Sequence, residues 1–492
     1  MNRRSSPGIG QWLIVALMVA LVIFLLFKLY QYGSFRRFFP AGLEIGSIDV
    51  GGLTREEAAD RLSDRYLSAS VIVSHGDEPI EVSPTDIEFV LDLETMLGQA
   101  DYQRQQQDFW SGFWGFLWNR PIEVEQIELR ASHNPEALRD VLETLSTHFD
   151  KPALPPQPVP TTLSFQYGEP GISTDVDASI TDGQAAFYRA IDREARLVLE
   201  PTDPTRPDIN LLARLIVNHL QDFDGLASIF IMDLTSGEEV TVNPDIAMSG
   251  MSIVKVPIVL ETFRALDDDL SLEQAKLISE TLVIQSGNFS ANLLLDVIAG
   301  EDNAFLGADI LSESMQKLGL ENTFIVTPYE ERPRSGRSTY ETAANSVEGL
   351  LTQPDPAMQT TAEDIGTLLA MVYRCAQDGG GALVAAYDGE ISQEECQQLL
   401  DYMDLNHIGS LIEEGVPEDV AVAHKHGWIS DTHGDAGIVF SPGGDYVIVA
   451  FMYKPEWLEW EISSPLLADI SRATYNFFNF DDPYLSVSGS SQ

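Results

Sequence analysis

One lysine of this chain lies inside an apolar segment, three residues after a serine. The stretch 248–257 reads Met-Ser-Gly-Met-Ser-Ile-Val-Lys-Val-Pro, and a helix-periodic apolar run continues to about residue 265. Ser252 and Lys255 are three residues apart, a spacing that places two side chains on one face of a helix. A serine hydroxyl becomes a nucleophile when a neighbouring base takes its proton, and a desolvated lysine amine can be that base. The pair predicts acyl transfer at Ser252; the simpler alternative is a helix start with a solvated lysine.

Two further polar motifs follow in the C-terminal half of the chain. The first is Ser286-Gly-Asn288, in which the serine can relay a proton and the asparagine can hold a substrate amide or the lysine. The second is Lys425-His-Gly427, at the end of an expected strand, where the lysine places a fixed cation beside a substrate carboxylate.

The order of these three motifs resembles that of the penicillin-recognising serine hydrolases, specifically the class A β-lactamase-like branch. The segments Ala291-Asn-Leu-Leu-Leu295 and Thr360-Thr-Ala-x-Asp364 also match. The resemblance covers residues 208–480 and implies an α+β catalytic domain of the β-lactamase/transpeptidase type, with a five-stranded antiparallel sheet beside a helical lobe. The sequence has no metal-ligand spacing, phosphate-binding glycine loop or nucleotide fingerprint, so no metal or cofactor is implied.

The resemblance also implies roles for individual residues. Ser252 would be acylated, Lys255 would accept its proton, and Ser286 would carry a proton to the leaving nitrogen. The backbone N–H groups of Ser252 and Trp428 would form the oxyanion hole. The expected substrate-binding residues are Asn288, Lys425, His426, Gly427 and Trp428.

The sequence departs from the family pattern at two motif positions. Gly287 stands where the family has Asp, which buttresses that loop, and His426 stands where it has Thr or Ser. A protonated His426 imidazole would replace the missing hydroxyl and make activity pH-sensitive; alternatively, His426 only packs against Trp428.

Deacylation needs a base that activates water. Glu341 and Asn345 have the family's four-residue spacing and lie in the expected interval, so Glu341 is the predicted catalytic glutamate. This spacing is also common on any helix. Glu330, Glu331 and Glu348 are competing candidates, and without an active base the acyl-enzyme would persist.

Length and charge limit the remaining possibilities. A chain of 492 residues is long enough for two or three domains. Its net charge of −47, from 29 basic and 76 acidic residues, argues against a nucleic-acid partner, because phosphate contacts need clustered Lys and Arg. In the catalytic region the sequence predicts helices over 210–221 and 464–478 and an all-helical stretch from Ser252 to about residue 405. It predicts strands over 227–234, 420–429, 436–440 and 446–453, with a short strand after the turn that follows the first of them.

The first 40 residues are expected to anchor the protein in a membrane. Residues 9–30 are almost wholly apolar, and about 20 such residues span a bilayer. A secretory signal peptide is the rival interpretation, but no small-x-small cleavage site follows the apolar run. We therefore expect a single-pass cell-membrane protein with an extracytoplasmic catalytic domain. Cys375 and Cys396, the only cysteines, form a candidate disulfide there, and two free buried thiols are the alternative.

Residues 41–200 are expected to form a small α+β domain, followed by a linker at 201–207; residues 481–492 are expected to be a tail. Thr54 and Glu57 predict a capped helix. The opening Ile-Asp-Val-Gly-Gly-Leu-Thr and the strand–helix succession resemble the peptidoglycan-binding domain found beside VanW-type proteins, which implies wall association. Trp110, Trp114 and Trp118 form one helical stripe that favours core packing over a sugar platform or a membrane-proximal patch.

These observations predict a membrane-anchored serine hydrolase that acts on β-lactams or cell-wall peptides through acyl-Ser252. A D-Ala-D-Ala peptidase, a penicillin-binding protein or an esterase on the same scaffold is the second hypothesis. A non-catalytic wall-binding protein, with residues 41–200 as its working part, is the third; Gly287 and His426 favour it, and the intact Ser252, Lys255, Ser286 and Lys425 oppose it.

Overall fold

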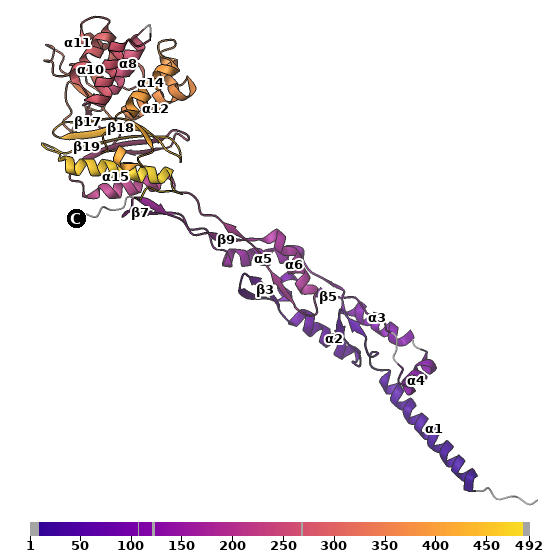
Figure 1. The fold of residues 1–492 in the computed structure, drawn as a ribbon. Coiled ribbons are helices and arrows are strands. Elements are labelled where there is room, and N and C mark those ends of the chain that lie inside the picture. The colour runs from indigo at the N-terminus through magenta and orange to yellow at the C-terminus, as the bar shows by residue number, and fades with distance from the viewer. Residues whose placement is uncertain (1–8, 107, 121–123, 267–268, 486–492) are drawn as a thin grey trace, which may run out of the picture. The chain divides into compact units, whose positions relative to one another are not determined.

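The computed structural model describes residues 9–106, 108–120, 124–266 and 269–485, which divide into two compact units (Figure 1). One unit contains residues up to Leu154 and Glu169–Asp203, and the other contains Pro155–Gly168 and everything after Pro204. Residues 1–8 of the expected anchor and residues 486–492 of the expected tail lie outside the described residues.

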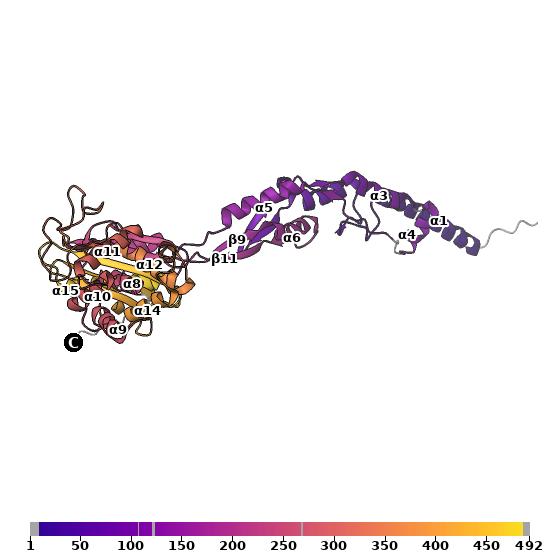
Figure 2. The ribbon, with the colours of Figure 1, turned by 90° about the horizontal axis from the view of Figure 1, so that it is seen from above.

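A five-stranded antiparallel sheet forms the centre of the second unit (Figure 2). Its strand order is β13-β12-β19-β18-β17. The bounds are β12 Leu226–Asp233, β13 Glu239–Val242, β17 Ala421–Trp428, β18 Thr432–Phe440 and β19 Tyr446–Tyr453. These strands lie where the sequence predicts them, except that β18 begins four residues earlier than residue 436.

Helices cover both faces of this sheet, so its middle strands are apolar on both sides. Alternate residues of β19 show the division: Val447, Val449 and Phe451 pack with the helical lobe, whereas Ile448 and Ala450 pack with helices α7 Ile209–His219 and α15 Trp460–Phe478. The lobe contains α8 Lys255–Ala265, α9 Leu272–Ser279, α10 Asn288–Ala299, α11 Ala304–Lys317, α12 Ala362–Asp378, α13 Ala382–Ala386 and α14 Gln393–Asp404.

The region expected to be wholly helical also contains a small three-stranded sheet. Its strands are β14 Met248–Ser249, β15 Phe324–Ile325 and β16 Met358–Thr360, in the order β14-β16-β15. This sheet fixes the chain immediately before Ser252. The structure also pairs Cys375 with Cys396, which joins α12 to α14.

A hairpin of β7 Gln157–Val159 and β8 Ser164–Gln166 packs with the second unit, although the sequence assigned residues 155–168 to the N-terminal domain. Leu163 and Phe165 are buried in the core that contains α7 and α15, and Asn476 donates a hydrogen bond to the Leu163 carbonyl. Residues 152–160 contain five prolines, which indicate an extended connector and give no sign of this packing.

The N-terminal unit has its own hydrophobic core. Its helices are α1 Ile9–Phe35, α2 Arg55–Ser63, α3 Leu93–Gln106, α4 Phe109–Leu117, α5 Pro135–Phe149 and α6 Val176–Tyr188. Its strands are β1 Glu44–Ile45, β2 Ile48–Asp49, β3 Val71–His75, β4 Glu78–Val82, β5 Val90–Leu91, β6 Ala131–Ser132, β9 Gly171–Asp175, β10 Glu194–Arg196 and β11 Val198–Thr202. Thr54 and Glu57 form the predicted capping box of α2.

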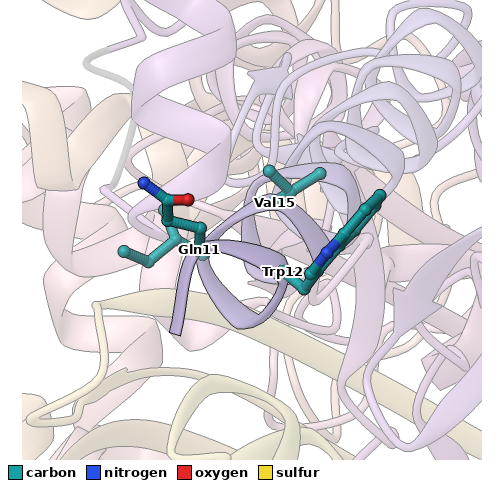
Figure 3. Close-up of a pocket in the computed structure, with 4 residues that line it drawn as sticks. Gln11, Trp12 and Val15 are labelled. Atoms are coloured by element: carbon teal, nitrogen blue, oxygen red, sulfur yellow. The ribbon is translucent and has the colours of Figure 1, made fainter. Parts of the chain in front are cut away.

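Helix α1 is the one helix among the described residues that is long and apolar enough to cross a membrane. None of its most apolar stretch is buried within the protein. Figure 3 shows Gln11, Trp12 and Val15 pointing away from the helix near its start; the hollow that they border belongs to α1 alone, and we assign it no ligand.

Candidate active site

The site is assembled where the start of α8 meets the start of α10 and the end of β17. Ser252 lies in the turn before α8 rather than on the helix, and the Lys255 N–H bonds back to the Ser252 carbonyl at 3.3 Å. Met251 adopts a positive φ of 50°, and the Tyr329 hydroxyl donates a 2.6 Å hydrogen bond to its carbonyl. Backbone strain of this kind clusters at functional sites.

The Lys255 amine has four oxygen neighbours. Its Nζ lies 3.0 Å from Ser252 Oγ, 2.5 Å from the Ser286 carbonyl, 3.2 Å from Ser286 Oγ and 2.8 Å from Asn288 Oδ1. A neutral amine has two N–H groups, which can donate hydrogen bonds to the Ser286 carbonyl and to Asn288 Oδ1. Its lone pair is then free to accept a proton from a serine hydroxyl. The arrangement therefore suits proton transfer from Ser252 or Ser286.

Burial and charge favour the neutral form of this lysine. Lys255 is fully buried. Desolvation, followed by repulsion from Lys425, lowers the pKa of Lys255 to about 7, although Glu330 opposes the shift. About half of the Lys255 amines would be neutral near that pH, which is what a general base needs.

Ser286 and Asn288 are held by a loop whose support differs from the family pattern. Ser286 has a φ of 50°, and a Cβ on Gly287 would come within 2.6 Å of Ser290 Oγ. That hydroxyl accepts a 2.9 Å bond from Thr281 and donates to the Gly287 carbonyl at 3.2 Å. The Ser290 hydroxyl, held by Thr281, thus occupies the space where the side chain of the missing Asp would begin.

Lys425 is fully buried on β17, and its Nζ donates a 3.0 Å hydrogen bond to the His426 carbonyl. Desolvation lowers its pKa to about 8, and Asp435 opposes this. Gly427 is needed for close packing: an added Cβ would lie 2.9 Å from Ser252 N and 2.9 Å from Met251 Cβ. The end of β17 therefore lies against the backbone amide of Ser252, and Trp428, which follows, is 63 % exposed.

His426 is not a cation in this structure, contrary to one of the two roles that the sequence left open. Desolvation, followed by repulsion from Lys425, lowers the pKa of His426 to about 4. Its ring packs beside that of His424, at 6.4 Å between centroids, and Asn406 Nδ2 lies 3.5 Å from its Nδ1. The imidazole is therefore neutral at ordinary pH and offers hydrogen bonds without charge.

A buried ion pair that the sequence did not reveal lies beside Lys425. His424 Nδ1 is 2.9 Å from Asp435 Oδ1, and its Nε2 is 2.7 Å from the Asn406 carbonyl. A carbonyl and an ionised carboxylate can only accept hydrogen bonds. Both ring nitrogens therefore donate, and His424 is charged. Burial lowers the pKa of His424, but Asp435 outweighs it, and the net shift is upward. His433 is buried on β18 against Ser463 and Trp460.

The structure brings Glu330, not Glu341, into contact with these groups. Glu330 accepts a 2.9 Å hydrogen bond from Asn288 Nδ2, and Asn288 in turn contacts Lys255. Reciprocal bonds of 3.0 and 2.9 Å between Asn292 and the Tyr329 backbone hold this segment on α10.

Glu341 is exposed, and among the described residues no hydrogen bond or ion pair reaches its side chain. Asn345 bonds to the Tyr340 carbonyl and to Gln359 rather than to Glu341.

The geometry defines a class of site: a serine hydroxyl, a buried lysine with lowered pKa, a second serine and a strand-borne lysine cation, as in hydrolases that acylate serine. Sequence comparison leads to the same class. The model of the β-lactamase enzyme family matches residues 211–281 and 276–478, more than half of the chain, and the chain belongs to that family. The match includes none of residues 1–210, so wall binding by residues 41–200 stays a prediction.

Solved structures of low sequence identity resemble the chain over the same region. PBP-A is 21 % identical in sequence, and the match covers 56 % of this chain and 99 % of the PBP-A chain, with a TM-score of 0.42. A β-lactamase from Sphaerobacter thermophilus is 19 % identical, covering 56 % and 99 %, with a TM-score of 0.41. An ancestral class A β-lactamase is 18 % identical, covering 54 % and 98 %, with a TM-score of 0.40. No curated protein matches the sequence.

Proposed function

We propose that this protein hydrolyses β-lactams through an acyl-Ser252 intermediate. The contact that carries the proposal is the 3.0 Å approach of Lys255 Nζ to Ser252 Oγ, together with a Lys255 pKa of about 7. A serine next to a lysine that is partly neutral at physiological pH is ready to attack a carbonyl. Membership of the β-lactamase enzyme family supplies the substrate class.

In the acylation step, Ser252 Oγ bonds to the lactam carbonyl carbon and its proton passes to Lys255. The tetrahedral intermediate places its oxyanion between the Ser252 and Trp428 amides, and Lys425 holds the substrate carboxylate. The C–N bond then breaks, Ser286 gives its proton to the leaving nitrogen, and Lys255 returns a proton to Ser286. The Lys255–Ser286 contact of 3.2 Å supports this exchange.

Hydrolysis of the resulting ester needs a base for water. Among the glutamates that the sequence suggested, Glu330 is the one whose carboxylate contacts the lysine–asparagine group, so we assign it this role in place of Glu341. Water attacks the ester carbonyl and gives a proton to Glu330. As the bond from the carbonyl carbon to Ser252 Oγ breaks, this proton passes from Glu330 to Lys255 and from Lys255 to Ser252 Oγ, which leaves all three groups as they began.

A penicillin-binding role is the second candidate, and the exposure of Glu330 favours it. A carboxylate in free contact with solvent holds a water less firmly than an enclosed one, which would leave the acyl-enzyme long-lived. A D-Ala-D-Ala peptidase or an esterase would use the same acylation machinery on cell-wall material.

We further propose that α1 anchors the chain, with the second unit on the extracytoplasmic side. The bare apolar surface of α1 supports an anchor, and the Cys375–Cys396 disulfide supports an oxidising compartment.

Intact-protein mass spectrometry of the full chain with benzylpenicillin, sampled over time, tests the enzymatic proposal. An adduct that forms and decays, and is absent in Ser252→Ala, is the expected result. An adduct that persists would support the penicillin-binding role. Absence of an adduct in the native protein would contradict both, and turnover of a D-Ala-D-Ala peptide or an ester would then identify the remaining enzymes.

A further inference from the structure

Helix α4 has two aromatic faces, and only one of them is covered. Phe109, Phe113 and Phe116 pack on Tyr32 of α1, with ring centroids 5.5, 5.8 and 5.5 Å apart. On the outer face Trp110 is 59 % exposed and Trp114 is 51 % exposed, and Trp118, the next residue of the stripe, is 70 % exposed. The stripe is therefore not core packing, which was the favoured interpretation of the sequence.

The position of α4 along α1 suggests what covers the tryptophans. From Trp12 to Tyr30, α1 would span about 27 Å at 1.5 Å per residue, close to the hydrocarbon thickness of a bilayer, about 30 Å. Tyr32 and Phe35 follow directly, and Phe116 packs on both. Helix α4 is thus attached to α1 at the level where a membrane-spanning helix leaves the hydrocarbon. Trp and Tyr concentrate at that level in membrane proteins.

The distribution of charged residues around α1 and α4 also indicates a membrane surface. The chain has a net charge of −47, yet its first acidic residue is Glu44. Two cations border the α1–α4 contact: Lys28 lies 5.8 Å from the Phe116 ring centroid and Arg36 lies 5.5 Å from that of Phe109. One acidic residue, Asp108, caps the start of α4 beside them. Basic side chains beside a membrane helix attract anionic headgroups, whereas most of this chain would be repelled by them.

We propose that α4 lies in the headgroup layer of the bilayer that α1 spans, with Trp110, Trp114 and Trp118 facing anionic lipid. This inference rests on the proposed anchoring of α1 and adds a second membrane contact, which fixes the rotation and depth of the N-terminal unit at the surface. Without this second contact, the N-terminal unit could rotate about the axis of α1.

Single cysteines can report on this contact, because both native cysteines are paired in the disulfide. Three full-length variants would carry a fluorophore at Leu21→Cys in α1, Trp114→Cys in α4 and Trp457→Cys, a tryptophan of the second unit that is 62 % exposed. Each is placed in bilayers of phosphatidylethanolamine and phosphatidylglycerol that contain lipids with a nitroxide quencher at mid-chain or at the headgroup.

We expect the mid-chain quencher to quench the label at position 21, the headgroup quencher to quench the label at position 114, and neither to quench the label at position 457. If position 21 is quenched and position 114 responds no more than position 457, the interfacial helix is refuted and the anchor stands. If position 21 is not quenched, the anchor itself fails. A label at position 114 that is protected from aqueous iodide but not quenched by lipid would indicate a protein or glycan cover and would also refute the proposal.

Discussion

Two buried lysines set the pH dependence expected of this site. Acylation needs Lys255 neutral, so its rate should rise as pH increases through about 7, the pKa of Lys255. Binding of the substrate carboxylate needs Lys425 charged, so the rate should fall as pH passes about 8. We therefore expect a narrow bell-shaped profile of the benzylpenicillin acylation rate. A rate independent of pH between about 5 and 10 would contradict the assignment of Lys255 as base.

Lys425→Gln is the control for this profile. It removes the charge that repels protonated Lys255, so the pKa of Lys255 should increase and the rising limb should move to higher pH. The falling limb should disappear, because the group that titrates there is gone. If Lys425→Gln lowered the acylation rate at every pH without shifting either limb of the pH profile, Lys425 would not set the pKa of Lys255.

Glu330 and Glu341 are distinguished by paired substitutions to glutamine. Because Glu330 contacts Asn288 and Glu341 is solvated, Glu330→Gln should slow decay of the penicillin adduct by about 100-fold or more, the usual effect of losing a general base. Glu341→Gln should leave it unchanged. Time-resolved mass spectrometry of the adduct measures both rates. Slower decay in Glu341→Gln but not in Glu330→Gln would identify Glu341, as the family spacing predicts, as the base for deacylation.

At the scale of elements, the approach of β17 to the Ser252 turn depends on Gly427. In Gly427→Ala the new Cβ would meet Ser252 N and Met251 Cβ at 2.9 Å, which forces the strand and the nucleophile apart. A displacement of about 1 Å costs on the order of 100-fold in rate, so we expect that loss in acylation by benzylpenicillin. Gly380→Ala, where a Cβ meets nothing within 4 Å, is the matched control and should keep full activity.

The sequence predicts those elements whose signal is local. The strand over 446–453 is an apolar run, the strand over 420–429 begins with four apolar residues, and the motif order locates Ser252, Lys255, Ser286 and Lys425. The contacts that the sequence does not predict join residues that are far apart along the chain or lie on paired strands. The Tyr329 hydroxyl reaches Met251 over 78 residues of sequence separation, and His424 meets Asp435 only because β17 and β18 pair in one register. The spacing of Glu341 and Asn345 does not show where Glu341 lies, because it contains no information on where a long loop turns.

At the scale of the whole molecule, the chain passes between the two units three times. It crosses after Leu154, returns after Gly168 and crosses again after Asp203, so residues 155–168 belong to the second unit while the segment that follows them does not. A catalytic fragment that begins at residue 208 would lack the hairpin and expose the core that Leu163 and Phe165 cover. The full chain is therefore the proper material for kinetics.

Phe165→Ala tests whether the hairpin stabilises the second unit. Phe165 is buried in the core with α7 and α15, and truncation of a buried Phe costs about 3–5 kcal/mol. We expect faster hydrogen exchange throughout β12 and β19, with no change in β3 of the N-terminal unit, as measured by mass spectrometry on the full chain. Gln166→Ala, at the next and exposed position, should alter neither. Equal acceleration in both units would mean that they unfold together, and no acceleration would mean that the hairpin is only a connector.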